Sequence, residues 1–255
     1  MTPEPPIHLS LVIPAHCEEK RLPTSLPRIR SYFDAQPHTW EIVLVDDGST
    51  DRTSEVAAEL LQGTEHTILR NEPNAGKGAS IRRGMLASRG AYALFSDADL
   101  STPIEMIERF WPEVERGVDV VFGSRALPES DLAIRQPLHR ELMGRTFNVF
   151  VRLIALPGVR DSQCGFKMFS REAVERIFPL QRMDGFSFDV EILRLAREWG
   201  FRLAEVPVRW EDSPDSRVHP IRDSAAMLRD LFRVRREVRR LRRAGTFDRA
   251  GRSEP

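Results

Sequence analysis

Five short apolar segments constrain this chain most, because each runs directly into a polar or glycine-rich loop and then into a helical pattern. They lie at residues 9–13, 41–45, 66–70, 91–96 and 119–122. Strands of this kind, separated by helices, are typical of a parallel sheet that is covered on both faces. The succession predicts a doubly wound, mostly parallel α/β sheet over residues 8–125.

The loops after these segments all come at the carboxyl ends of predicted strands. They cover residues 14–19, 46–51, 74–78 and 97–101. In an open parallel sheet this edge is where ligands bind, so we expect the four loops to converge on one crevice.

The rest of the chain is less regular. Helices are expected at 138–155, 172–178, 189–199 and 227–243, a loop at 158–167 and a strand at 203–208. Since the chain shows no repeat and no low-complexity linker, residues 8–243 predict one domain, in which 126–243 form a C-terminal elaboration. The small and charged residues 244–255 predict a flexible tail.

Charge and cysteine content argue against several classes of protein. The chain has 38 basic and 38 acidic side chains and so no net charge, which argues against a dedicated nucleic-acid binder. Cys17 and Cys164 form no CxxC pair and suggest no disulfide framework. No signal-peptide pattern is present, and no apolar run reaches the roughly 18–20 residues of a membrane span. We therefore expect a cytoplasmic protein.

The pair Asp97-Ala-Asp99 follows the fourth apolar segment. Two carboxylates at this spacing on a loop can face one hard cation, and Mg²⁺ favours few protein carboxylates combined with substrate phosphates. The alternative is structural, with Asp97 ending a strand and Asp99 forming a turn before a helix.

Two further loops strengthen the first interpretation. Asp46 and Asp47 end the second segment and are more acidic groups than a turn and a helix cap require. Residues 74–78 open a helix with two glycines and Lys77, one of only three lysines in the chain. Their backbone N–H groups and the ammonium could hold a phosphate or a hydroxyl.

In order and spacing, the motifs at residues 11–18, 45–49, 74–78 and 96–101 resemble the inverting glycosyltransferases of family 2. Residues 123–125, 160–167 and 188–191 resemble its dolichyl-phosphate β-glucosyltransferase branch, close to the polyprenyl-phosphate mannose synthases. The resemblance covers roughly residues 8–235. It implies a GT-A fold, a nucleotide-sugar donor and a Mg²⁺ or Mn²⁺ cofactor held by Asp97 and Asp99. The implied donor-binding residues are Pro14, Glu18, Asp46, Asp47, Lys77, Asp97 and Asp99.

The acceptor in this branch is a lipid monophosphate, which is already anionic at neutral pH and needs positioning more than deprotonation. Arginines suit that task because they bind phosphate in a bidentate fork. The resemblance implies acceptor-binding roles for Arg125, Arg135, Arg140, Gln163, Lys167 and Arg217, and catalytic roles for Asp99, Asp161 and Asp189. Asp189 has an alternative explanation as an acid at a helix N-terminus.

Two segments could meet a membrane that carries such an acceptor. Residues 147–156 are unusually apolar. Residues 227–243 combine an apolar stripe with eight arginines against two acidic residues, as in peripheral membrane helices. The alternative is that the stripe packs on the domain or on a second subunit. The oligomeric state is left open.

The resemblance predicts a metal-dependent enzyme that moves a hexose onto a polyprenyl phosphate with inversion, with glucose from UDP-glucose as the leading candidate. The alternatives are mannose from GDP-mannose, a soluble hydroxyl acceptor, and a non-catalytic module that binds a nucleotide-sugar. The last is disfavoured because Asp47, Lys77, Asp97 and Asp99 are all present.

Overall fold

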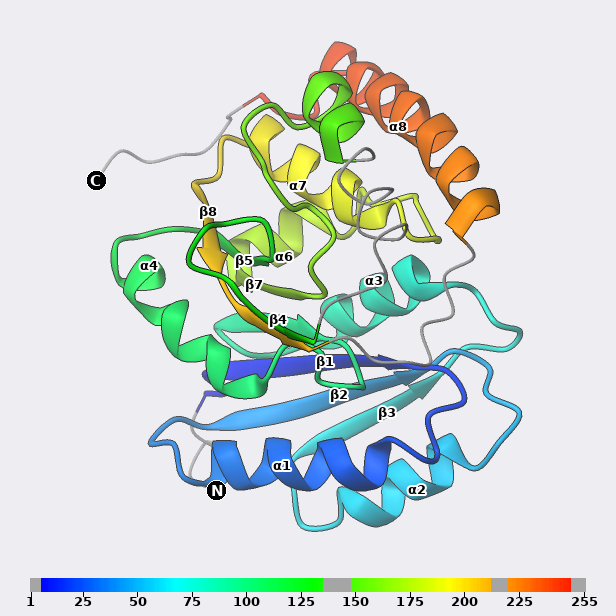
Figure 1. Ribbon diagram of the computed structural model, residues 1–255, viewed down its shortest axis with the longest axis vertical. Helices are drawn as coiled ribbons and strands as arrows, with labels where there is room; N and C mark the ends of the chain where they lie inside the picture. The colour runs from blue at the N-terminus through cyan, green and yellow to red at the C-terminus, as the bar shows by residue number, and fades with distance from the viewer. Residues whose placement is uncertain (1–5, 135–147, 212–219, 249–255) are drawn as a thin grey trace.

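The protein is described as a computed structural model covering residues 6–134, 148–211 and 220–248. Its main sheet has seven strands in the order β3-β2-β1-β4-β7-β5-β8 (Figure 1). The strands are β1 Leu9–Ala15, β2 Trp40–Asp46, β3 His66–Arg70, β4 Tyr92–Ser96, β5 Val120–Ser124, β7 Phe166–Ser170 and β8 Leu203–Pro207. β1 to β4 are parallel, as are β5 and β8, so the predicted doubly wound, mostly parallel sheet is confirmed.

Alternate side chains of the strands enter two separate cores, one on each face. Val12, Val43 and Phe95 point into one core, and Leu11, Ile42 and Leu94 into the other. The first face is covered by α3 Lys77–Ala87, α6 Arg171–Ile177, α7 Phe188–Glu198 and α8 Pro220–Arg243. The second is covered by α1 Leu22–Asp34, α2 Thr53–Leu60, η1 Ile104–Arg109 and α4 Trp111–Glu115 (Figure 1). Burial on both faces explains why the strands are apolar throughout.

Strand β7 is the main departure from the expected fold. It runs antiparallel to both β4 and β5 and lies between them. The loop expected at residues 158–167 therefore ends earlier, because Phe166 and Lys167 already belong to this strand. An antiparallel strand needs no crossover helix before it, so the helix–strand alternation gave no signal for it.

A small second sheet was also not predicted. It pairs β6 Asp131–Ile134 with β9 Arg209–Glu211 in parallel. Strands of three and four residues are too short for an alternating pattern to be recognised.

The apolar stripe of the C-terminal helix α8 packs on the domain, which is one of the two alternatives that the sequence left open. Leu231, Val234 and Val238 of α8 are buried in the core on the first face. The stripe therefore packs on the domain and is not available to a membrane. None of the helices in the described ranges is long and apolar enough to cross a membrane.

Two expected boundaries differ in detail. Residues 148–154 are helical, whereas positions 138–147 of the expected helix lie outside the described residues. Beyond α8, Phe247 packs its ring on Trp199 with the centroids 5.3 Å apart. The first part of the expected tail, residues 244–248, is thus held on the domain.

Candidate active site

The predicted convergence of the strand-end loops is confirmed. The Cys17 N–H after β1 donates to Ser49 Oγ after β2 at 2.8 Å. The Asn74 side-chain amide donates to the Asp47 carbonyl at 2.9 Å. At the start of α3, Lys77 Nζ lies 2.5 Å from Asp97 Oδ1, directly after β4. The four loops, which follow β1, β2, β3 and β4, therefore meet at one edge of the sheet.

Asp47 organises the glycine-rich loop before α3. Its Oδ1 accepts hydrogen bonds from the Ala75 N–H at 2.9 Å and from the Asn71 side chain at 2.8 Å. Its Oδ2 accepts from the Gly76 N–H at 2.9 Å. The carboxylate is buried and bonded within the protein, which makes it the support of the loop that carries Lys77.

Asp46 is equally enclosed at the end of β2. Its carboxylate accepts from the Ser49 N–H at 2.9 Å, from the Ser54 hydroxyl and from Arg70 Nη1 at 2.8 Å. Burial acts to raise the pKa of Asp46, but these hydrogen bonds and the Arg70 charge outweigh it and lower the pKa. Asp46 therefore fixes the turn that follows β2.

The amides of the glycine-rich loop are not arranged as the sequence suggested. Those of Ala75 and Gly76 bond to Asp47, and those of Gly78 and Ala79 donate to the Asp184 carbonyl at 2.7 and 3.3 Å. The expectation that the backbone of residues 74–78 holds a phosphate is therefore wrong for the amides of Ala75, Gly76 and Gly78. Gly76 has φ +98°, and an added Cβ would lie 2.5 Å from Asp184 O, so both its conformation and its packing require glycine. What the loop presents to the site is the Lys77 ammonium.

Asp97 and Asp99 lie at the end of β4 on a tight turn. Asp99 Oδ1 accepts the Ser101 N–H at 3.0 Å, and Leu100 between them has φ +51°, a strained conformation for a non-glycine residue. The side chains of Lys77 and Asp97 are 27% and 33% exposed, so their ion pair is partly open to the surface. Gly165 passes so close that an added Cβ would collide with the Asp97 carboxylate.

A buried pair lies behind these groups. Lys167 of β7 is 0% exposed, and its Nζ lies 2.5 Å from Asp189 Oδ1 in the first turn of α7 and 2.5 Å from the Cys164 carbonyl. Because Lys167 is fully buried, it has no surface with which to contact an acceptor. Its predicted role as an acceptor ligand needs correction, and its position makes it the support of Asp189.

Charges link this buried pair to the loop groups. Burial acts to lower the pKa of Lys77, but the carboxylates of Asp97, Asp189 and Asp99 outweigh it and raise the pKa. Burial raises the pKa of Asp189, against the opposing effect of Lys167 and Lys77. The alternative explanation, that Asp189 is only an acid at a helix N-terminus, does not account for its interactions with Lys167 and Lys77.

Arg125 and Asp161 form a second, bidentate pair after β5. Arg125 Nε and Nη2 donate to the two Asp161 oxygens at 2.7 and 2.9 Å, and the Arg125 backbone N–H adds a bond at 3.0 Å. Burial acts to raise the pKa of Asp161, but Arg125 outweighs it and lowers the pKa to about 2. Burial acts to lower the pKa of Arg125, but Asp161 outweighs it and raises the pKa, and the charge of Asp189 adds to this effect. Asp161 thus fixes the direction of the guanidinium.

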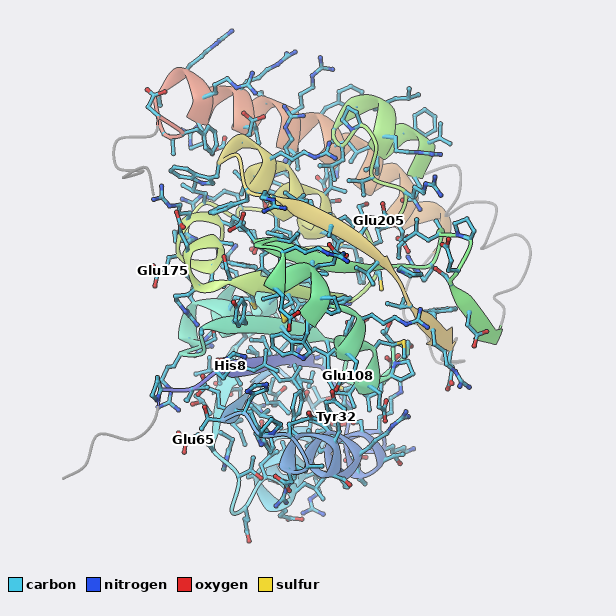
Figure 2. All side chains as sticks on the ribbon, turned by 90° about the vertical axis from the view of Figure 1, so that its left-hand side faces the viewer. His8, Tyr32, Glu65, Glu108, Glu175 and Glu205 are labelled. Atoms are coloured by element: carbon cyan, nitrogen blue, oxygen red, sulfur yellow. The ribbon has the colours of Figure 1, made fainter. Side chains whose placement is uncertain are left out.

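Three further residues hold this pair in place, and two of them were not predicted. Gln163 donates its backbone N–H to Asp161 Oδ1 at 3.0 Å. Glu205 of β8, labelled in Figure 2, accepts the N–H groups of Arg160 and Asp161 at 2.9 and 2.7 Å. The Trp210 ring of β9 lies 5.5 Å from the Arg125 guanidinium. Glu205 and Trp210 stand in short strands, where no local pattern marks them.

Glu191 of α7 supports the loop that covers the start of α3. Its Oε2 accepts the N–H groups of Arg182 and Met183 at 2.9 and 2.7 Å. Burial, opposed by these bonds, raises the pKa of Glu191 to about 7. The same loop supplies the Asp184 carbonyl that holds Gly78. Glu191 belongs to the motif at residues 188–191, but the sequence predicted no role for it.

The remaining predicted residues are placed as follows. Pro14 lies in β1 opposite Val45, and the Glu18 carboxylate lies 3.1 Å from Arg21 at the start of α1. Arg135, Arg140 and Arg217 lie outside the described residues, so their acceptor roles stay predictions.

The predicted metal ligands are the two carboxylates of Asp97 and Asp99. In the described ranges no group of three or more His, Cys, Asp or Glu side chains could hold a cation. Asp97 and Asp99 fit a hard cation that takes few protein oxygens and completes its shell with ligand phosphates. A cation at Asp97 would share that carboxylate with the Lys77 ammonium.

The sequence is similar to known glycosyltransferases. The model of the family "Glycosyl transferase family 2" matches residues 10–178, more than half of the chain. Dolichyl-phosphate beta-glucosyltransferase of Dictyostelium discoideum is 34% identical over 242 residues, covering 90% of this chain and 74% of the relative. The Homo sapiens protein of the same name is 34% identical over 248 residues, covering 91% and 76%.

Solved structures show the same GT-A fold. Mannosyl-3-phosphoglycerate synthase from Rubrobacter xylanophilus has a TM-score of 0.67 at 21% identity, covering 98% of this chain and 79% of its own. Glucosyl-3-phosphoglycerate synthase from Mycobacterium tuberculosis, solved with Mn²⁺, UDP and glucosyl-3-phosphoglycerate, has a TM-score of 0.60 at 23% identity, covering 94% and 80%.

Proposed function

Because the chain belongs to glycosyltransferase family 2, we propose that it transfers glucose from UDP-glucose, with inversion, to the phosphate of a polyprenyl phosphate such as dolichyl phosphate. The observation that carries this proposal is the single charged cluster at the strand ends. In this cluster Lys77 contacts Asp97. The charge of Asp189 interacts with the charges of Lys77 and Arg125. The names of the relatives at about 34% identity support the choice of glucose and of the lipid.

On the donor side, Asp97 and Asp99 would hold a Mg²⁺ or Mn²⁺ ion. Such an ion supplies Lewis-acid stabilisation of the charge that develops on a departing diphosphate. The mycobacterial synthase crystallised with Mn²⁺ and UDP supports this choice of cofactor and donor nucleotide. Lys77 adds a positive charge beside the same carboxylate, where it faces an anionic ligand. Glu18 would line the nucleoside pocket, and Asp46 and Asp47, which are buried and bonded within the protein, would support the loops around it.

On the acceptor side, Arg125 would bind the lipid phosphate. A phosphate monoester has a second pKa of about 6 and is nucleophilic at neutral pH without a strong base. Its oxygen must instead be aimed at the anomeric carbon, and orientation of this kind is a large part of catalysis. Asp161 and Trp210 fix the guanidinium from two sides. Asp189, supported by Lys167, would accept hydrogen bonds from the sugar hydroxyls.

The acceptor also determines the cellular location of the proposed reaction. A polyprenyl chain stays in the bilayer, so the enzyme would meet its phosphate at the cytoplasmic surface of a membrane. No nucleic-acid partner is needed for this chemistry.

A label-partition assay tests the function. The protein is incubated with radiolabelled UDP-glucose, Mg²⁺ and polyprenyl phosphate, and we expect label to enter the organic phase as a lipid-linked sugar. GDP-mannose and a soluble phosphorylated acceptor serve as competing substrates in parallel reactions. Label that remains aqueous on a new compound would contradict the lipid acceptor, and turnover of GDP-mannose alone would contradict the donor.

A further inference from the structure

Two helices that contribute no residue to the candidate active site carry exposed apolar side chains. In the described part of the chain, six large hydrophobic side chains are exposed. Four of them lie on the helix of residues 148–154 and on α8. They are Val149 at 42%, Phe150 at 40%, Leu153 at 76% and Phe232 at 59% exposure. Single exposed hydrophobic residues need no explanation, but a cluster of them marks an interaction surface.

The two helices lie side by side, as both views show (Figures 1 and 2). Val151 of the first and Val234 of α8 enter the same core. Glu198 at the end of α7 links them, because its Oε1 lies 2.7 Å from Arg194 Nη2 and its Oε2 bonds to Arg242. Arg194 in turn donates to the Ala155 carbonyl at 2.9 Å. The four exposed residues therefore lie on two neighbouring helices of the same layer.

One edge of α8 adds positive charge to this surface. Arg233, Arg240 and Arg242 pair with Asp230, Glu237 and Glu198. Among the residues that the structure describes, no salt bridge involves Arg235, Arg236, Arg239 or Arg243. Positions 232, 235, 239 and 243 are spaced by three and four residues, so Phe232 and three of these arginines share one side of the helix.

We infer that this surface docks on a bilayer that contains anionic lipids. Leu153, Phe150 and Phe232 would enter the boundary between headgroups and acyl chains, and the arginines would bind lipid phosphates. A second copy of the chain fits less well, because a two-fold contact would bring the arginine edges of both copies together. The inference rests on the proposed function in one respect: docking would bring the active site to a lipid acceptor.

Vesicle co-sedimentation tests the surface without any reaction. We expect the full chain to bind vesicles of phosphatidylcholine mixed with phosphatidylglycerol, to bind pure phosphatidylcholine weakly, and to lose binding as salt rises. Arg235→Gln with Arg239→Gln should weaken binding about 25-fold, since each basic residue near such a surface contributes about fivefold. Leu153→Ser with Phe232→Ser should weaken it at least about tenfold.

Matched controls are available elsewhere on the chain. Leu86→Ser removes another exposed apolar side chain, and Arg52→Gln with Arg116→Gln removes two exposed arginines far from α8 in the sequence. These variants should bind vesicles as the wild type does. Because all the changed side chains are exposed, thermal unfolding should confirm that each variant folds.

The outcomes separate this surface from the proposed function. Unchanged vesicle binding in the arginine or apolar variants, or no binding by the wild type, would overturn the inference. A dimer in light scattering that the same variants dissociate, with no vesicle binding, would assign the surface to a second copy and also overturn it. Vesicle binding that the variants abolish, in a protein that transfers sugar to no acceptor, would support the surface while the proposed function fails.

Discussion

Six aspartates of the candidate site carry the same carboxylate in different environments, and each environment indicates a different task. Asp46, Asp47 and Asp161 are buried, with their oxygens bonded to neighbouring groups of the protein. Asp189 is buried against a lysine. Asp97 keeps a third of its side chain exposed, and Asp99 stands on the same turn. Ligand contact is therefore expected at the last two, and support of other residues at the first three.

Arg125→Ala should weaken use of the acceptor and leave use of the donor unchanged. Asp161 holds the guanidinium through Nε and Nη2, and losing a charge-assisted contact between the remaining N–H groups and a phosphate costs roughly 1.5–3 kcal/mol, about 10- to 150-fold in affinity. Steady-state kinetics with each substrate varied in turn measure this split. An increase in the KM for UDP-glucose alone would refute the assignment.

Asp161→Asn should destabilise the protein, because it leaves the Arg125 charge without its buried partner. Breaking a buried pair by removing one member typically costs about 3–5 kcal/mol. Chemical denaturation at neutral pH provides the measurement, with Glu113→Gln as the control, since its partner Arg116 is 67% exposed and such a surface pair is worth no more than about 1 kcal/mol. Equal stability of the two variants would show that Asp161 does not hold Arg125.

Elements contribute by bringing loops from distant parts of the chain against one another. The loop before α7 supplies the Asp184 carbonyl that holds the first turn of α3, and it is itself held by Glu191. The loop before β7 places Gly165 against Asp97. The position of Lys77 and Asp97 thus depends on segments that follow them by many residues.

Gly165→Ala should lower kcat strongly while the fold remains stable. Its added Cβ collides with the Asp97 carboxylate, and a displacement of about 1 Å in such a group can cost on the order of a hundredfold in rate. Gly185→Ala is the matched control, because its Cβ meets nothing within 4 Å. Comparable kcat values for the two variants would contradict the packing argument.

Glu191 predicts a pH dependence of stability. Its folded-state pKa of about 7 lies above the ordinary value of 4.5, so its contribution is present below pH 4.5 and is lost as the pH rises through 7. The full loss amounts to at most about 3 kcal/mol. Unfolding free energies measured from pH 5 to 8 should fall less steeply in Glu191→Gln, which retains an oxygen to accept the two amides. The same slope in both proteins would exclude Glu191 as the cause.

At the scale of the whole molecule, the sequence predicted the parallel strands and the edge at which the loops meet. Each of β1 to β4 is a short, mostly apolar segment with a turn signal after it, and this pattern is local. The pairing of Asp97 with Lys77, the burial of Lys167 and the position of β7 depend on contacts between distant segments. The glycine-rich loop shows the difference most clearly: its residues were recognised, but Asp47 and Asp184 take the amides that a phosphate was expected to use.

Ligand binding should stabilise the whole fold through this site. UDP together with Mg²⁺ is expected to raise the melting temperature more than either alone, because the ion would join the nucleotide to Asp97 and Asp99. The exposed-site variant Leu86→Ser should respond as the wild type does. A shift with UDP that Mg²⁺ leaves unchanged would argue against a shared metal.

The central claim is that the carboxylates after β4 hold the cation and the donor whose sugar is passed to a lipid phosphate. Its most direct test is the rate of label transfer from UDP-glucose to polyprenyl phosphate in the wild type and in Asp99→Asn, which can keep the hydrogen bond to the Ser101 N–H but loses the charge. We predict a loss on the order of a thousandfold in the variant, and loss of wild-type activity in a metal chelator that added Mg²⁺ or Mn²⁺ restores. Transfer at the wild-type rate in Asp99→Asn, or in the presence of chelator, would contradict the account.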